Sequence, residues 1–355
     1  MWIVTLLIFI FILSIIVLVH ELGHFFWAKK FGVHIDEFSI GMGPKVWGKK
    51  GKDGIDYNIR AIPIGGFVAM AGEVYEEEGI DIPKDKFLCN KPWWQRAIVM
   101  IAGVVNNFIL ALLLIFLSTI FFKTVEPTLI IESVVPNSPV SNAGIKAGDK
   151  IVAVGGKEVS YLNEFNIRLI FESDKKSHVL TIEHENGKRE DYKITPKEMT
   201  LEDGTKITYG FEYHQEKIDT LGKKISYTFR TFFETFDTMN LTLYGLFTGK
   251  VSVSDLSGPV GIFELVDDSV TVDQSFVTNI QIIIYLIWLL SINVGYLNIL
   301  PFPAFDGGRL LFIVIEKIKG SPVNEKFENI CHTIGFILIM LLIVFVTIND
   351  IIKLF

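Results

Sequence analysis

Two histidines and a glutamate near the N-terminus have the types and the spacing of a metal-dependent hydrolytic site. The segment Val19–Phe25 has the sequence VHELGHF, which contains the pattern His-Glu-x-x-His. On an α-helix His20 and His24 are four residues apart and lie on one face, where two neutral imidazoles can bind one Zn²⁺. Glu21 then lies beside the metal, where a carboxylate can act as general base.

The surroundings of this pattern favour a functional site. No charged residue occurs between Ile3 and Leu18. Ionisable groups at the end of such an apolar helix are costly in lipid, and they are retained for a function by default. The alternative is a polar helix end at the membrane interface that carries two unrelated histidines. A third candidate ligand much later in the chain argues against that alternative.

The third candidate ligand is Asp306. It lies in the segment Asn298–Arg309, NILPFPAFDGGR, where two prolines and two glycines break a helix while the sequence is still apolar. Unwound backbone at membrane depth is tolerated only where it lines protein or a wet cavity. Asp306 is therefore the natural third metal ligand, although an aspartate that only caps the next helix remains an alternative.

The composition indicates a polytopic α-helical membrane protein. Half of the 355 residues are hydrophobic, and the net charge of −7 gives no reason to expect nucleic-acid binding. The first apolar segment has no Lys or Arg before it, so we expect a retained helix and not a cleaved signal peptide. Four transmembrane helices are predicted, at residues 1–28, 96–122, 277–300 and 330–352.

Lysines predict the orientation of these helices. Lys29 and Lys30 end the first helix, and Lys317 and Lys319 lie in the loop between the last two helices. By the positive-inside rule both segments are cytoplasmic, which places the His-Glu-x-x-His pattern near the cytoplasmic face of the plasma membrane. Cys89 and Cys331 lie far apart in the sequence and on that side, so we expect free thiols.

The cytoplasmic-side region 29–95 alternates between polar and apolar residues and is rich in glycine, which predicts antiparallel strands. Its segment Gly65-Gly66-Phe67 is apolar. An open strand edge there can accept an extended peptide by strand addition, whereas an ordinary surface hairpin is the equally weighted alternative. In the second helix, Asn106 and Asn107 must face protein or water, either for interhelical hydrogen bonds or for catalysis.

A polar part follows the second helix. Residues 126–200 predict a compact domain of strands with short helices, and residues 201–276 follow it with an amphipathic helix at Ile218–Phe247. His178, His184 and His214 have no partner at metal-binding spacing and are expected at the surface. We expect His332, at the start of the last helix, to cap or to pair at an interface. Residues 301–329 form the Asp306 loop and a cytoplasmic loop.

These motifs together resemble the site-2 protease family of intramembrane zinc metalloproteases. The chain has His-Glu-x-x-His in the first helix and Asn-x-Leu-Pro-x-Pro-x-x-Asp-Gly-Gly at the third. The run from Ser138-Pro139 to Ile151 is similar to the SPAxxAGLxxGDxI pattern of bacterial PDZ domains. One PDZ domain followed by Ser257-Gly258-Pro259-Val260-Gly261-Ile262 matches the bacterial RseP-like branch.

The resemblance implies a zinc endopeptidase that cuts single-span membrane proteins in regulated intramembrane proteolysis, with anti-sigma factors or remnant signal peptides as substrates. It implies Zn²⁺ on His20, His24 and Asp306, with Glu21 as base. It implies substrate-binding roles for Asn298, for Asn107, and for Gly65, Gly66 and Phe67, which resemble a membrane-associated β-hairpin. The PDZ domain would be extracytoplasmic, and its ligand is not implied.

Two other functions are compatible with parts of the sequence. A membrane-tethered PDZ adaptor without catalytic activity would only bind partner tails, but the complete set of His20, Glu21, His24 and Asp306 argues against it. A zinc transporter would need polar ligands along the whole membrane path, and the sequence offers one cluster near one face.

Overall fold

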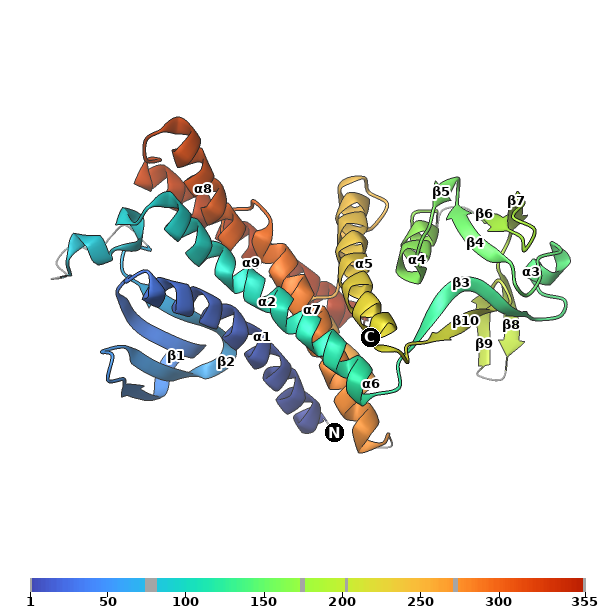
Figure 1. Cartoon of the computed structure of the whole chain (residues 1–355), viewed down its shortest axis with the longest axis horizontal. Coiled ribbons are helices and arrows are strands. Elements are labelled where there is room, and N and C mark those ends of the chain that lie inside the picture. Colours follow the sequence, from blue (N-terminus) through green and yellow to red (C-terminus); the bar gives the residue numbers. More distant parts are fainter. Residues whose placement is uncertain (1, 74–81, 173–175, 202–203, 271–273, 354–355) are drawn as a thin grey trace. The chain divides into compact units, whose positions relative to one another are not determined.

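The computed structural model describes residues 2–73, 82–172, 176–201, 204–270 and 274–353. The chain divides into two compact units (Figure 1). The first unit contains residues 1–115 and 256–355, and the second contains residues 116–255.

Among the described residues, four helices are long and apolar enough to cross a membrane, which is the number that the sequence predicts. They are α1 (Trp2–Lys30), α2 (Trp93–Phe121), α7 (Phe276–Ile299) and α9 (Glu325–Lys353). Large apolar side chains are exposed along them, for example Leu7 and Phe11 on α1 and Leu341 on α9. A lipid environment accepts such surfaces, whereas water does not.

Two shorter helices complete the first unit, α6 (Pro259–Ser269) and α8 (Asp306–Lys319). Buried residues of α1, α6 and α7 form one apolar core: Phe9, Ile12, Ile16, Val266, Leu286, Ile287 and Leu290. The buried carboxylate of Asp350 on α9 accepts hydrogen bonds of 2.8 Å from the backbone N–H groups of Gly258 and Gly261. It therefore satisfies donors that the N-terminus of α6 would otherwise leave unpaired.

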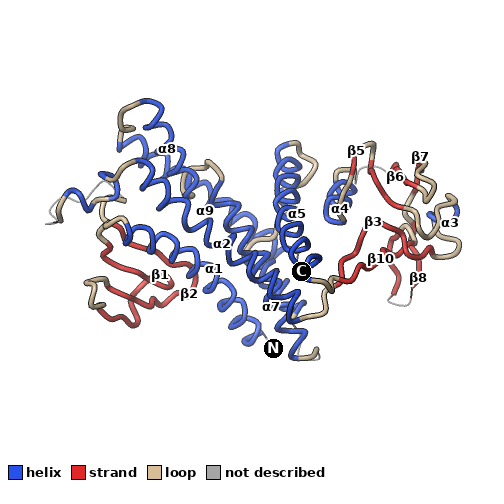
Figure 2. Tube along the Cα trace, viewed as in Figure 1, coloured by secondary structure: helices blue, strands red, loops and turns tan. Residues whose placement is uncertain are grey.

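A long hairpin of β1 (Ile35–Lys50) and β2 (Asp56–Met70) lies beside α1, as the red strands near it in Figure 2 show. The hairpin folds back on itself, because the first part of β1 pairs with both ends of β2. Ser39, for example, is opposite Asn58 on one side and Phe67 on the other. Residues 66–70 thus form one outer strand. Short 3₁₀ turns at Lys84–Lys86 and Leu88–Asn90 lead into α2.

The second unit is built on a sheet with strand order β10-β3-β4-β6-β7, with β5 paired to β4. The strands of this sheet are β3 (Val125–Val134), β4 (Lys150–Val154), β5 (Lys157–Glu158), β6 (His178–Glu183), β7 (Arg189–Ile194) and β10 (Phe211–Lys217). Helices α3 (Pro139–Asn142), α4 (Leu162–Ile170) and α5 (Leu221–Phe247) accompany it, with a 3₁₀ turn at Val253–Asp255. A separate hairpin pairs β8 (Lys197–Leu201) with β9 (Gly204–Thr208).

The sequence predicts that the compact domain ends at residue 200, but a domain with this end would lack β10, the edge strand of the sheet. β10 pairs with β3 along its length, although more than 75 residues separate them. Phe211 and Tyr213 of β10 pack against the apolar core around the fully buried Phe165. The compact β-rich domain therefore extends to Lys217.

Two histidines that are expected at the surface have hydrogen-bond partners within the second unit. His178 is 8% exposed, and its ring nitrogens contact the hydroxyl of Tyr209 at 2.5 Å and the backbone oxygen of Glu172 at 3.2 Å. His184 contacts Asp149 and Tyr192. The surface expectation is wrong for the buried His178, whereas the side chain of His184 is 20% exposed. Spacing along the chain does not reveal partners on neighbouring strands. Within the described part of the chain, neither Cys89 nor Cys331 forms a disulfide, in line with the prediction.

Candidate metal centre

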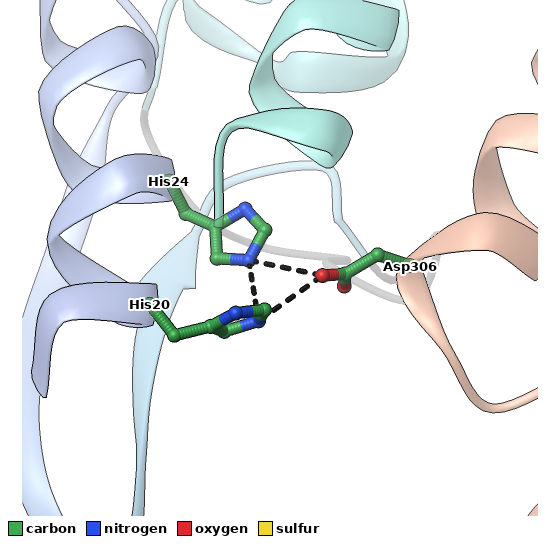
Figure 3. A group of neighbouring side chains, drawn as sticks. All are labelled: His20, His24 and Asp306. Atoms are coloured by element: carbon green, nitrogen blue, oxygen red, sulfur yellow. Dashed lines mark hydrogen bonds and ion pairs between the residues drawn. The ribbon is translucent and has the colours of Figure 1, made fainter. Parts of the chain in front are cut away.

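His20, His24 and Asp306 converge in the first unit, with one possible ligand atom from each lying within 4.8 Å of the others (Figure 3). Oδ2 of Asp306 lies 3.1 Å from Nε2 of His20 and 3.3 Å from Nε2 of His24. The two Nε2 atoms are 3.2 Å apart. The histidines come from consecutive turns of α1, and the aspartate enters from the first turn of α8.

Glycines make this convergence possible by bringing α1 and α2 close together. A Cβ on Gly23 would lie 2.3 Å from the backbone oxygen of Ala102, so no side chain fits there. A Cβ on Gly103 would lie 2.4 Å from Nε2 of His24 and 2.8 Å from Nε2 of His20. Gly103 therefore leaves the space that the two imidazoles occupy. The amino-acid pattern alone does not single out Gly103.

Glycines also fix the position of Asp306. After α7 ends at Ile299, the chain turns through residues 300–305 before α8 begins. A Cβ on Gly307 would lie 2.3 Å from the backbone oxygens of Ile299 and Leu300, and one on Gly308 would lie 2.4 Å from that of Phe302. The Gly-Gly pair lets α8 start directly against the end of α7. Asp306 consequently points back toward α1.

Hydrogen bonds from the far side of each imidazole orient the rings. Nδ1 of His24 lies 2.8 Å from the backbone oxygen of Val99, an acceptor, so this nitrogen carries the proton and Nε2 keeps its lone pair. Nδ1 of His20 lies 3.4 Å from the side-chain amide of Asn107. A half-turn of that amide presents its buried oxygen, which otherwise has no hydrogen-bond partner, to a proton on Nδ1 of His20. Both rings then present a free Nε2 to the centre.

The three donors fit zinc. Two imidazole nitrogens and one carboxylate oxygen are a donor set of catalytic zinc sites, which keep a fourth position open. Donors held about 2.1 Å from a tetrahedral metal lie about 3.4 Å from one another, close to the separations seen here. Oδ2 of Asp306 is buried and, among the described atoms, has no hydrogen-bond partner. A cation between the three atoms would satisfy it.

Glu21 lies next to the outer strand of the hairpin. A Cβ on Gly66 would lie 3.3 Å from Cγ of Glu21 and 3.2 Å from Cγ1 of Val17, so the strand backbone passes close to α1 at this point. Gly65 has a φ of +84°, which a glycine adopts without strain. Phe67 packs under the guanidinium of Arg60, 5.0 Å from the ring centre. Gly66 thus lies beside the candidate base, with Gly65 and Phe67 as its neighbours in the strand.

The asparagines have different positions. Asn106 donates a hydrogen bond of 3.1 Å to the backbone oxygen of Val19, across the contact between α1 and α2. Asn107 is fully buried against His20, a position that favours orienting the ring over touching a substrate. Asn298 is half-buried in the last turn of α7, eight residues before Asp306.

Sequence comparisons agree with this geometry. The model of peptidase family M50 matches residues 8–342. The chain is 34% identical over 354 residues to a protein of Fusobacterium nucleatum named as a zinc metalloprotease. It is 33% identical over 429 residues to zinc metalloprotease RasP of Shouchella clausii, and 29% identical over 436 residues to the protease eep of Enterococcus faecalis. In each case 99% of both chains is covered.

The family match spans nearly the whole chain, including both motifs that supply the converging side chains. Its relatives are zinc metalloproteases by name. The four long apolar helices place this activity in a membrane protein. The chain is therefore a membrane metalloendopeptidase that belongs to peptidase family M50, the zinc-dependent site-2 protease family.

Proposed function

We propose that this protein cleaves single-span membrane proteins within or near the bilayer, with zinc bound by His20, His24 and Asp306. The convergence of two Nε2 atoms and one carboxylate oxygen beside Glu21 carries the proposal. When bound, zinc lowers the pKa of a coordinated water to about 7 and polarises the scissile carbonyl. Glu21, beside the metal position, would act as general base and would pass the proton to the leaving amine. Asn107 and the backbone oxygen of Val99 hold the two imidazoles in the ligating orientation.

The substrate is presented as an added strand on residues 66–70 of β2. This segment pairs with the first part of β1 on one side and, among the described residues, has no strand on its other side. A transmembrane helix shields its carbonyls by internal hydrogen bonds, so it must unwind before hydrolysis. Pairing with a strand edge both unwinds and orients the peptide next to Glu21. Asn298 would contact the peptide or hold the Asp306 loop.

The remaining assignments follow from the resemblance and from the charge pattern. The β-rich domain is proposed to be an extracytoplasmic PDZ domain, and the metal centre lies near the cytoplasmic face of the plasma membrane. Anti-sigma factors or remnant signal peptides are the proposed substrates, in regulated intramembrane proteolysis. The lysines at the end of α1, Lys29 and Lys30, support this orientation.

The substitution Glu21→Gln tests the catalytic assignment. It keeps the shape of the side chain and removes the base, so we expect full zinc content and at least a thousandfold loss of cleavage of a tagged single-span reporter. Zinc is measured on the purified protein and cleavage on the same sample. Retained turnover would remove Glu21 as the base.

The substitution Phe67→Pro tests strand presentation. Proline removes one backbone N–H from the strand at residues 66–70 and disturbs its pairing geometry, so we expect impaired cleavage with normal zinc content. Val46→Pro, in the outer strand at the opposite side of the folded hairpin, is the matched control. Equal activity of both variants and the wild type would count against presentation on residues 66–70.

A further inference from the structure

The loop that carries Asp306 contains a non-glycine residue in the left-handed region of backbone conformation. Ala304, two residues before Asp306, has a φ of +87°. An alanine in the left-handed region is strained, because its Cβ crowds the backbone, and such a conformation persists only where the surroundings impose it. The loop therefore needs an external contact that holds Ala304 in place.

His332 on α9 makes that contact. Its Nδ1 accepts a hydrogen bond of 3.1 Å from the backbone N–H of Ala304. The neutral ring then carries its proton on Nε2, which lies 3.9 Å from Oε1 of Glu328. The ring also packs on Phe312 of α8, with 5.5 Å between ring centres. One imidazole therefore contacts the loop before Asp306 and the helix after it.

A second contact on α9 lies one turn beyond His332. A Cβ on Gly335 would lie 2.2 Å from the backbone oxygen of Pro303. The absence of a side chain there lets α9 approach the loop closely enough for His332 to reach Ala304. Pro303 and Ala304 are thus held by adjacent turns of the same helix.

We propose that His332 is a positioning residue that imposes the strained loop conformation and thereby aims Asp306 at the metal. This rests on the proposed role of Asp306 as a ligand. Without the acceptor on His332, the loop relaxes around Ala304 and the carboxylate leaves its ligating position. Outer contacts of this kind change metal affinity by about tenfold or more when they are removed.

The test uses four variants of the full-length protein: His332→Ala, His332→Asn, Ala304→Gly, and the double variant Ala304→Gly with His332→Ala. The side-chain oxygen of Asn can replace Nδ1 as acceptor. Glycine adopts the loop conformation without strain, so it should not need the hydrogen bond. Alanine and asparagine are both smaller than histidine, so neither replacement creates a clash. His332 lines a cavity of about 370 Å³. Thr333→Ala, at the next position and lining the same cavity, is the control.

The readout is the rate of zinc release to a chelator, with cleavage kinetics measured in parallel. We expect His332→Ala to release zinc about tenfold faster and to lower kcat more than it raises KM. His332→Asn and the double variant should return toward the wild-type rate, and Thr333→Ala should not change it. Wild-type release in His332→Ala, or no recovery in the double variant, would overturn the proposal.

A separate variant distinguishes this proposal from the one on which it rests. If Asp306→Asn keeps its zinc, the ligand assignment fails, whatever His332 does. If Asp306→Asn loses zinc while His332→Ala releases it at the wild-type rate, only the positioning role fails.

Discussion

Each unit brings histidine together with aspartate, and the two arrangements differ in which atoms remain without a hydrogen bond. In the second unit Nδ1 of His184 lies 2.8 Å from Asp149, and Nε2 lies 3.0 Å from the hydroxyl of Tyr192. Asp149 also accepts the backbone N–H of Lys146. In the first unit three acceptor atoms face one another at 3.1–3.3 Å, and one of them, Oδ2 of Asp306, has no hydrogen-bond partner among the described atoms.

The difference shows how a structural pair is distinguished from a metal site. Protons satisfy the cluster around His184, because each ring nitrogen faces an oxygen that can accept its proton. At His20 and His24 the hydrogen bonds lie on the Nδ1 side, and both Nε2 atoms point to the same place as the carboxylate. Converging lone pairs repel unless a cation joins them. The surrounding packing must therefore hold His20, His24 and Asp306 together, whereas the hydrogen bonds around His184 hold that cluster together by themselves.

The substitution Gly103→Ala should have the largest effect on this comparison, because it disrupts the convergence of His20, His24 and Asp306. The added methyl group would occupy the space of the His20 and His24 nitrogens, although alanine favours the helix more than glycine does. We expect zinc affinity to fall at least tenfold, and cleavage with it, as measured by metal titration of the purified protein.

Val105→Ala is the matched control, since Val105 lies two residues away on α2 and is 40% exposed. It should retain both zinc and activity. Normal zinc affinity in Gly103→Ala would show that the helices can separate without losing the site, contrary to this account.

The substitution His184→Ala tests the hydrogen-bonded cluster of the second unit. It removes the ring from Asp149, which is 4% exposed, and leaves a buried carboxylate oxygen without that partner. We expect the second unit to lose about 1–3 kcal/mol of unfolding free energy, with zinc content unchanged. Local hydrogen exchange of the β-rich domain measures this change.

His214→Ala is the control for this variant. His214 is half exposed and lies 3.7 Å from Glu132, so its removal should change stability by less than about 0.5 kcal/mol. A fall in zinc content on replacing His184 would contradict the separation of the two histidine clusters.

The sequence pattern predicts those parts of the metal centre whose positions depend only on residues close to them in the chain. His20, Glu21 and His24 are placed by helical periodicity alone, and the proline and glycine residues around Asp306 mark the break that exposes it. The four long helices follow from uninterrupted apolar runs. These features require no knowledge of what lies across from them.

Other features depend on contacts between distant segments and were not predicted. The importance of Gly103 appears only when α2 lies against α1, since one glycine in an apolar helix has many explanations. β10 joins the sheet through its pairing with β3, far back in the chain. The contact of His332 with Ala304 likewise requires α9 to return to the Asp306 loop.

The most direct measurement is the zinc content of purified wild type and Asp306→Asn, alongside cleavage of a single-span reporter. This substitution keeps the size of the side chain and removes its charge, which weakens the carboxylate as a ligand. We expect one zinc per chain and cleavage in the wild type, with both lost in the variant. Unchanged zinc in Asp306→Asn would contradict the central claim that the three converging side chains hold the metal.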